Sequence, residues 1–139
     1  MTRSTRLHLA AATALTGLIV SFAMAFMGGP MSRHLPGIGF HLAAIFGAGG
    51  VGYVCAGAFG RPRRRGWLMA GFTAVWMTIA SAFAGATLLG LTVGTIETGV
   101  YGLFAIIDAA TSPAAVAVWA LCMTGLHLYA RDLRHDAAT

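Results

Sequence analysis

The sequence predicts an all-α integral membrane protein: a four-transmembrane-helix bundle with both termini in the cytoplasm and a short outer interfacial helix before the last span. Of its 139 residues, 58% are hydrophobic and only 9% are charged, whereas about 25% of the residues in soluble domains are charged. Apolar runs of about 20 residues, enough to cross a bilayer as one helix, recur along the chain. A single transmembrane bundle over residues 1–139 is the expected domain organisation.

Four apolar runs define the expected spans, which cover residues 7–27, 37–59, 67–90 and 113–130. The first run follows Arg3 and Arg6. The residues "AMA" at 23–25 fit a signal-peptidase site, so a cleaved secretory signal is an alternative for this segment. The run is long for the apolar part of a signal peptide, which favours a retained span.

The distribution of the nine arginines sets the expected orientation. Four crossings place eight of them on one side: Arg3, Arg6, Arg61, Arg63, Arg64, Arg65, Arg131 and Arg134. Arg33 falls on the other side. Because arginines are enriched in cytoplasmic loops, both termini should lie in the cytoplasm, in a bacterial-type inner membrane. The loop with Arg61 and Arg63–Arg65 is expected to fix this topology and to contact lipid headgroups.

The net charge of +5 does not indicate a nucleic-acid partner. A nucleic-acid binder needs an exposed basic surface with stacking aromatic residues. Here the arginines lie between apolar runs, so we expect no nucleic-acid binding.

Small residues recur every four positions along the second span. They are Ala44, Ala48, Gly52, Ala56 and Gly60. Small side chains let two helices in lipid approach closely and gain van der Waals contact, so these residues are expected to form a helix-packing seam. We expect the seam to pack within the bundle, with the third span able to supply the facing surface. Docking on another subunit is the alternative.

The segment before the last span is too long for one crossing. About 40 residues separate Gly90 from Ala130, and about 20 cross a bilayer. Serine followed by proline is a strong helix start, so Ser112 and Pro113 are expected to begin the last span. Residues 95–108 then form an interfacial helix, with its apolar face toward lipid and its acids toward water. A long last helix kinked at Pro113 and a re-entrant hairpin are the alternatives.

Two carboxylates in this segment, Glu97 and Asp108, are candidate transport residues. A carboxylate at the bilayer centre costs about 2.5–3.5 kcal/mol, so such residues usually couple or conduct protons or ions. The kinked helix or the re-entrant hairpin would carry Asp108 into the bilayer. The interfacial helix would instead leave both acids at the outer surface.

The five histidines raise the question of a haem or metal site. His41 and His127 are weak haem candidates, but they fall near opposite faces of the bilayer and cannot share one iron. The spacings typical of zinc sites are absent, and Cys55 and Cys122 are expected to be buried thiols. The sequence shows no nucleophile–base motif or phosphate-binding loop, so we expect neither catalysis nor a cofactor.

Composition and short loops favour a non-catalytic subunit or assembly partner within a larger membrane complex. Nearly all of the chain would be embedded, so its partners would be lipids and other membrane proteins or further copies of itself. The alternative is a small oligomeric transporter or channel that is coupled to protons or ions through Asp108 and Glu97. A haem-b electron-transfer bundle is the third hypothesis.

Overall fold

A computed structural model describes residues 2–30, 37–93 and 98–136. Every element within these ranges is helical: α1 (Arg3–Met27), α3 (Ile38–Cys55), the short 3-10 helix η1 (Ala56–Ala58), α4 (Arg63–Val93), α5 (Thr98–Ala110) and α6 (Pro113–Asp136). Four segments are long and apolar enough to cross a membrane: Arg3–Met27, Ile38–Ala58, Arg63–Gly90 and Pro113–Asp136. The prediction of an all-α chain with four helices able to span a membrane is therefore confirmed.

Hydroxyl side chains mark the start of two of these helices. Oγ1 of Thr2 accepts a hydrogen bond from the N–H of Thr5 (3.2 Å) at the start of α1. Oγ of Ser112 accepts one from the N–H of Ala115 (3.4 Å), and Pro113 is the first residue of α6. Each hydroxyl satisfies a backbone N–H that has no partner within its own helix. The start signal read from Ser112 and Pro113 thus coincides with the observed start of α6.

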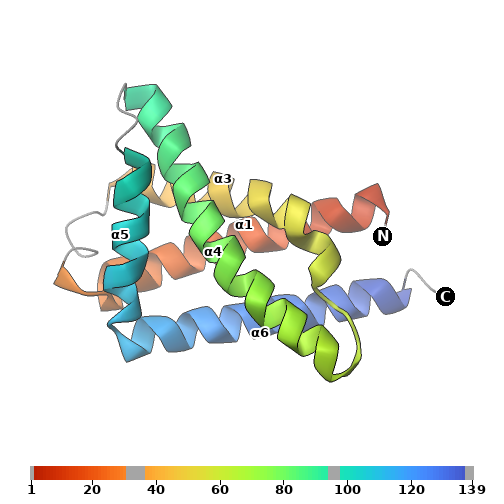
Figure 1. Ribbon diagram of the computed structural model, residues 1–139. Coiled ribbons are helices and arrows are strands. Elements are labelled where there is room, and N and C mark those ends of the chain that lie inside the picture. Colours follow the sequence, from red (N-terminus) through yellow and green to blue (C-terminus); the bar gives the residue numbers. More distant parts are fainter. Residues whose placement is uncertain (1, 31–36, 94–97, 137–139) are drawn as a thin grey trace.

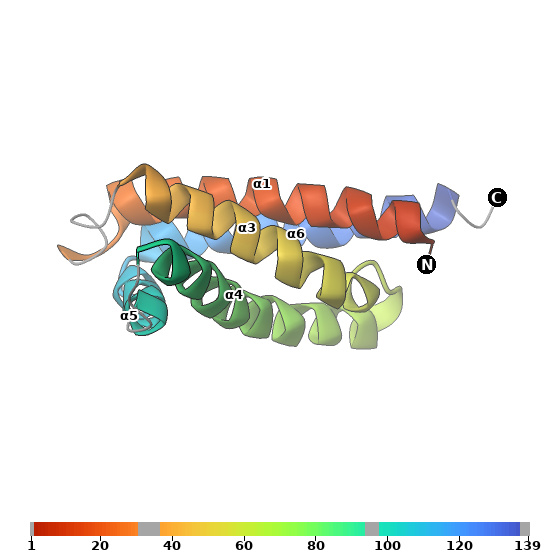
Figure 2. The same cartoon turned by 90° about the horizontal axis from the view of Figure 1, so that it is seen from above.

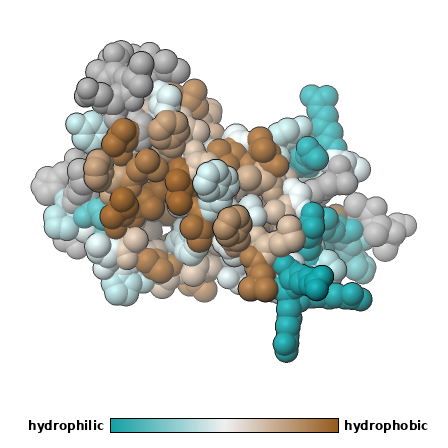
Figure 3. Space-filling model, in the orientation of Figure 1, coloured by the Kyte–Doolittle hydropathy of each residue, from teal (hydrophilic) through white to brown (hydrophobic). Residues whose placement is uncertain are grey.

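The helices form a bundle with two distinct ends. α1 and α6 lie side by side along its length, α3 packs on α1, and α4 crosses the bundle obliquely (Figures 1 and 2). The chain termini and the α3–α4 connection lie at one end, which we call the terminal end. α5 lies across the other end, which we call the α5 end, and is seen nearly end-on in Figure 2. Figure 3 shows hydrophilic residues gathered at the terminal end and an apolar surface along the middle.

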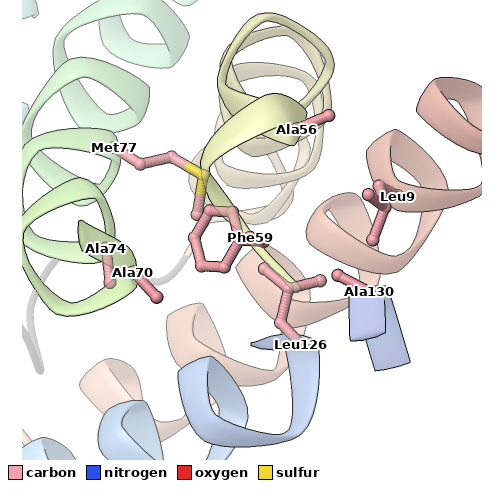
Figure 4. Close-up of a cluster of buried hydrophobic side chains, with 8 residues drawn as sticks. All are labelled: Leu9, Ala56, Phe59, Ala70, Ala74, Met77, Leu126 and Ala130. Carbon is pink, nitrogen blue, oxygen red and sulfur yellow. The ribbon is translucent and has the colours of Figure 1, made fainter. Parts of the chain in front are cut away.

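A buried apolar cluster closes the terminal end of the bundle (Figure 4). Its members come from α1, the α3–α4 connection with η1, α4 and α6: Leu9, Ala56, Phe59, Ala70, Ala74, Met77, Leu126 and Ala130. α4 and α6 meet in this cluster. They diverge toward the α5 end, where α5 bridges the gap between them (Figure 1). A smaller cluster of Met24, Ala105 and Ala109 packs α5 against the end of α1.

Candidate functional site

Small residues bring α1 and α3 into close contact. A Cβ built at Gly17 of α1 would lie 2.6 Å from both the carbonyl oxygen of Ala44 and Cβ of Ala48. A side chain at Gly52 would overlap Thr13 of α1. Three residues of the expected seam, Ala44, Ala48 and Gly52, therefore face α1.

A second line of small residues joins α3 to α4. A side chain at Gly47 would overlap the carbonyl of Ser81, and one at Gly85 would overlap the carbonyl of Ala43. These contacts lie on a different side of α3 from the α1 contacts. α3 is therefore held between α1 and α4 by small residues on two faces, which brings the backbones close enough for extensive van der Waals contact.

The periodic seam ends before its fifth residue. α3 stops at Cys55, and the 3-10 helix η1 that follows has about three residues per turn, which breaks the four-residue register. Gly60 lies beyond it in a turn with φ +72°, a conformation that glycine adopts without strain. A side chain there would overlap the carbonyl of Ala130 on α6. Gly60 is thus a turn residue that packs on α6, and the expectation that it continues a helical seam is wrong.

The arginines at the terminal end divide into two environments. Arg63, Arg64 and Arg65 are exposed. Arg134 is partly buried, and it donates hydrogen bonds from Nε to the carbonyl of Phe59 and from Nη2 to that of Gly57, each 2.9 Å long. Arg61 Nε also donates to the Gly57 carbonyl, at 3.2 Å. These carbonyls follow the end of α3 and need partners from outside the helix.

Arg134 thus has a role that charge counting did not reveal. The sequence assigned it to topology alone. In the fold, its guanidinium ties the last part of α6 to the carbonyls that follow α3. The sequence shows only that Arg134 is a cationic residue near the end of a helix. Its two carbonyl partners are more than seventy residues away in the chain, so the sequence does not reveal them.

The candidate transport acid Asp108 lies at the α5 end of the bundle. It belongs to the last full turn of α5, is partly exposed, and its carboxylate packs against Gly29, just after α1, where any side chain would overlap it. Because α5 lies across this end of the bundle (Figure 1), Asp108 lies at the end and not midway along the bundle. Glu97 and Arg33 lie outside the described residues.

The two histidines named as haem candidates have separate environments. His41 Nδ1 is hydrogen-bonded to Oγ of Ser21 on α1, at 2.8 Å. His127 is 1% exposed, and its Nδ1 accepts a hydrogen bond from the N–H of Gly60, at 3.3 Å, while the Trp67 ring lies 4.3 Å away. His127 Nε2 is buried without a hydrogen-bond partner among the described residues. Within the same residues, no group of three or more His, Cys, Asp or Glu side chains is placed to hold a metal ion.

Two adjoining cavities lie between the helices, from the α5 end to the middle of the bundle. One has a volume of about 320 Å³ and is lined by residues of α1, α3, α4, α5 and α6. The other, of about 280 Å³, is bounded by α4, α5 and α6 against α1. The two share the lining residues Val20, Met24, Thr78, Ile106 and Trp119. We call the pair the interhelical cavity. Its described lining is mostly apolar and includes no Asp, Glu, Arg or His.

This cavity was not predicted from the sequence, because the pattern of apolar residues does not indicate that α4 and α6 diverge. A partial signal exists for the packing of α5 on α4. A Cβ at Gly102 would lie 2.7 Å from the Ala82 carbonyl and 2.9 Å from Cβ of Ala86. Small residues in both segments are compatible with close contact but do not identify the helix that they face.

Together, the fold and these contacts define an all-helical protein with four helices able to span a membrane and an apolar cavity between them. Comparisons of the chain with known protein families, with curated proteins and with solved structures found no match.

Proposed function

We propose that this protein is a non-catalytic subunit that packs laterally against other membrane proteins in a bacterial-type inner membrane. The observation that carries the proposal is the outward face of α6, which is rich in small residues and has few neighbours within the chain. The exposed small residues of this face are Ala114, Ala117, Ala120, Thr124 and Gly125, and Leu121, which is 73% exposed, lies among them.

α6 is the spanning helix best suited to dock on a partner. It packs mainly on α1 and meets α4 and α5 only locally. A Cβ at Gly125 would find no atom within 4 Å, whereas Gly47 and Gly52 of α3 are already in close contact with neighbouring helices. Because small residues let helices in lipid approach closely, the outward face of α6 supports a lateral contact with another transmembrane helix.

The proposed topology places the terminal end in the cytoplasm. Arg3 and Arg6 near the start of α1 and Arg64 near the start of α4 are exposed, and Figure 3 shows hydrophilic residues gathered at this end. This distribution is typical of cytoplasmic loops. α5 would then lie in the outer interface. Its exposed apolar residues Val100 and Ile107 support that position, since they can face lipid while the small residues of α5 face the protein.

Two matched substitutions test the docking face. Gly125→Leu fills the open side of α6; Gly71→Leu makes the same change on α4, where the glycine is also exposed and a Cβ would find no atom within 4 Å. We expect partners cross-linked in native membranes, or a second copy of the chain, to be lost with Gly125→Leu and retained with Gly71→Leu. A wild-type protein that cross-links to nothing, or equal effects of the two substitutions, would show that the proposal is wrong.

A further inference from the structure

We propose that the interhelical cavity holds one acyl chain of a bilayer phospholipid from the leaflet on the α5 side. This inference is independent of the docking face on α6 and would hold for the isolated protein in a bilayer. It rests on the depth, the lining and the opening of the cavity.

The depth of the cavity matches one leaflet. Along α1, its lining extends from Met24, near the α5 end, to Thr13. These residues are eleven positions apart, which corresponds to about 16 Å at the helical rise of about 1.5 Å per residue. Half of the bilayer hydrocarbon core is about 15 Å. The first of the two spaces, about 320 Å³ in volume, is elongated over that depth and suits a single hydrocarbon chain. The second, of about 280 Å³, lies beside it between α4 and α6 and forms the opening.

The lining of the cavity is mostly apolar, and most of its polar side chains already have hydrogen-bond partners within the protein. Trp119 Nε1 donates a hydrogen bond to Oγ1 of Thr78, at 2.9 Å, and the Thr78 hydroxyl donates to the Ala74 carbonyl, at 2.8 Å. Ser21 and Thr13 are likewise hydrogen-bonded within the protein. These groups are satisfied within the protein, and the other polar side chains of the described lining are Thr16, Ser81 and Tyr101. A lining that is otherwise apolar favours an apolar occupant.

The opening of the cavity faces the hydrocarbon of the bilayer. Val75 and Ile79 on α4 and Val116 on α6 border it and are 51%, 40% and 42% exposed. A molecule that enters between α4 and α6 must therefore come from the membrane interior. Toward the terminal end, the buried cluster around Phe59, Met77 and Leu126 closes the space (Figure 4).

A lipid chain fits this space better than other occupants. An empty apolar cavity loses dispersion contacts along its walls, and water is unfavourable where polar partners are scarce. A transmembrane helix, with a diameter of about 10 Å, is too wide for a space of this volume and depth. At the α5 end, Tyr101 lines the cavity and is 52% exposed. Tyrosine is typical of the headgroup level of a membrane.

Native mass spectrometry of the full chain, released from phosphatidylglycerol–phosphatidylethanolamine nanodiscs, tests the proposal. Val116→Trp fills the opening, and Val54→Trp makes the same change at a 77% exposed position on α3 that lines neither cavity. We expect one phospholipid per chain in the wild type and in Val54→Trp. Its occupancy should fall at least about tenfold in Val116→Trp, because the indole displaces the chain from its contacts. Equal retention in both variants, or a retained isoprenoid in place of a phospholipid, would overturn the proposal.

A second measurement uses the wild-type protein, so that it does not depend on whether Val116→Trp folds. The wild-type protein is reconstituted with a phospholipid that carries a diazirine at the middle of one acyl chain, and the cross-linked residues are mapped. We expect insertion at Val20, Ile106 and Trp119, which line both cavities. Cross-linking confined to outward residues such as Leu68 and Phe72, which are 74% and 78% exposed, would refute a bound chain.

Discussion

Trp119 on α6 donates a hydrogen bond from its indole Nε1 to Oγ1 of Thr78 on α4, with 2.9 Å between the two atoms. Both residues line the interhelical cavity, where α4 and α6 have begun to diverge. The bond therefore joins two helices that otherwise share few contacts outside the cluster at the terminal end. The Thr78 hydroxyl in turn donates a hydrogen bond to the carbonyl of Ala74 on its own helix.

Removal of this hydrogen bond should destabilise the fold modestly. Hydrogen bonds between transmembrane helices average about 0.6 kcal/mol and reach about 1.7 kcal/mol, so we expect a loss in this range for Thr78→Val, measured by unfolding in a denaturing detergent. The control is Thr87→Val, because within the described part of the chain the Thr87 hydroxyl donates only to the Phe83 carbonyl of its own helix. A double-mutant cycle with Trp119→Phe should show coupling; additive effects would contradict the link.

Close contact between α3 and α4 should depend on Gly47. Gly47→Ala would place a methyl group against the Ser81 carbonyl, which neither backbone can avoid without separating the helices. We expect a destabilisation of about 1–3 kcal/mol. Gly50→Ala on the same helix, where a Cβ meets nothing within 4 Å, should be neutral or stabilising by up to about 1 kcal/mol. Similar thermal stability of the two variants would disagree with the observed packing.

Loss of the Arg134 guanidinium should loosen the end of α3. Arg134→Gln removes two charged hydrogen bonds to the carbonyls of Gly57 and Phe59, each worth about 1.5–3 kcal/mol. In a Cys122→Ala background, we expect Cys55, the last residue of α3, to react faster with a maleimide. The control, Arg131→Gln, alters an exposed neighbour and should leave the rate unchanged. Equal rates in both variants would mean that Arg134 does not hold this end.

Position 108 should be accessible from outside the cell. In a background that lacks Cys55 and Cys122, Asp108→Cys places a thiol at the α5 end, where the native side chain is partly exposed. We expect a membrane-impermeant maleimide to label it in intact cells, whereas Arg64→Cys at the terminal end reacts only after the membrane is opened. Labelling of position 64 in intact cells would reverse the proposed topology. An unreactive position 108 would place Asp108 within the bilayer and favour a transport role.

The start of α6 was readable from the sequence because its cause is local. A serine hydroxyl caps the helix, and proline suits the first position regardless of what the helix later packs against. The packing partners of the second span were predicted less well. Its small residues identified α3 as a closely packed helix, but Ala44, Ala48 and Gly52 proved to face α1 while Gly47 faces α4, and Gly60 proved to lie in a turn. Small residues permit close approach on any face, so spacing alone cannot name the partner helix.

The sequence by itself determined that the chain is helical and that four of its helices can cross a membrane, because length and hydropathy alone decide whether a helix can span hydrocarbon. The tertiary structure decided that α4 and α6 diverge, that α5 lies across the gap, and that an apolar cavity remains beneath it. In lipid, the outside of a helix is as apolar as its packed face, so no hydrophobic stripe encodes which faces meet. The direction of each helix is set by backbone contacts such as those of Gly47 and Gly52 and by polar links such as Trp119 to Thr78, which exist only once distant segments are brought together.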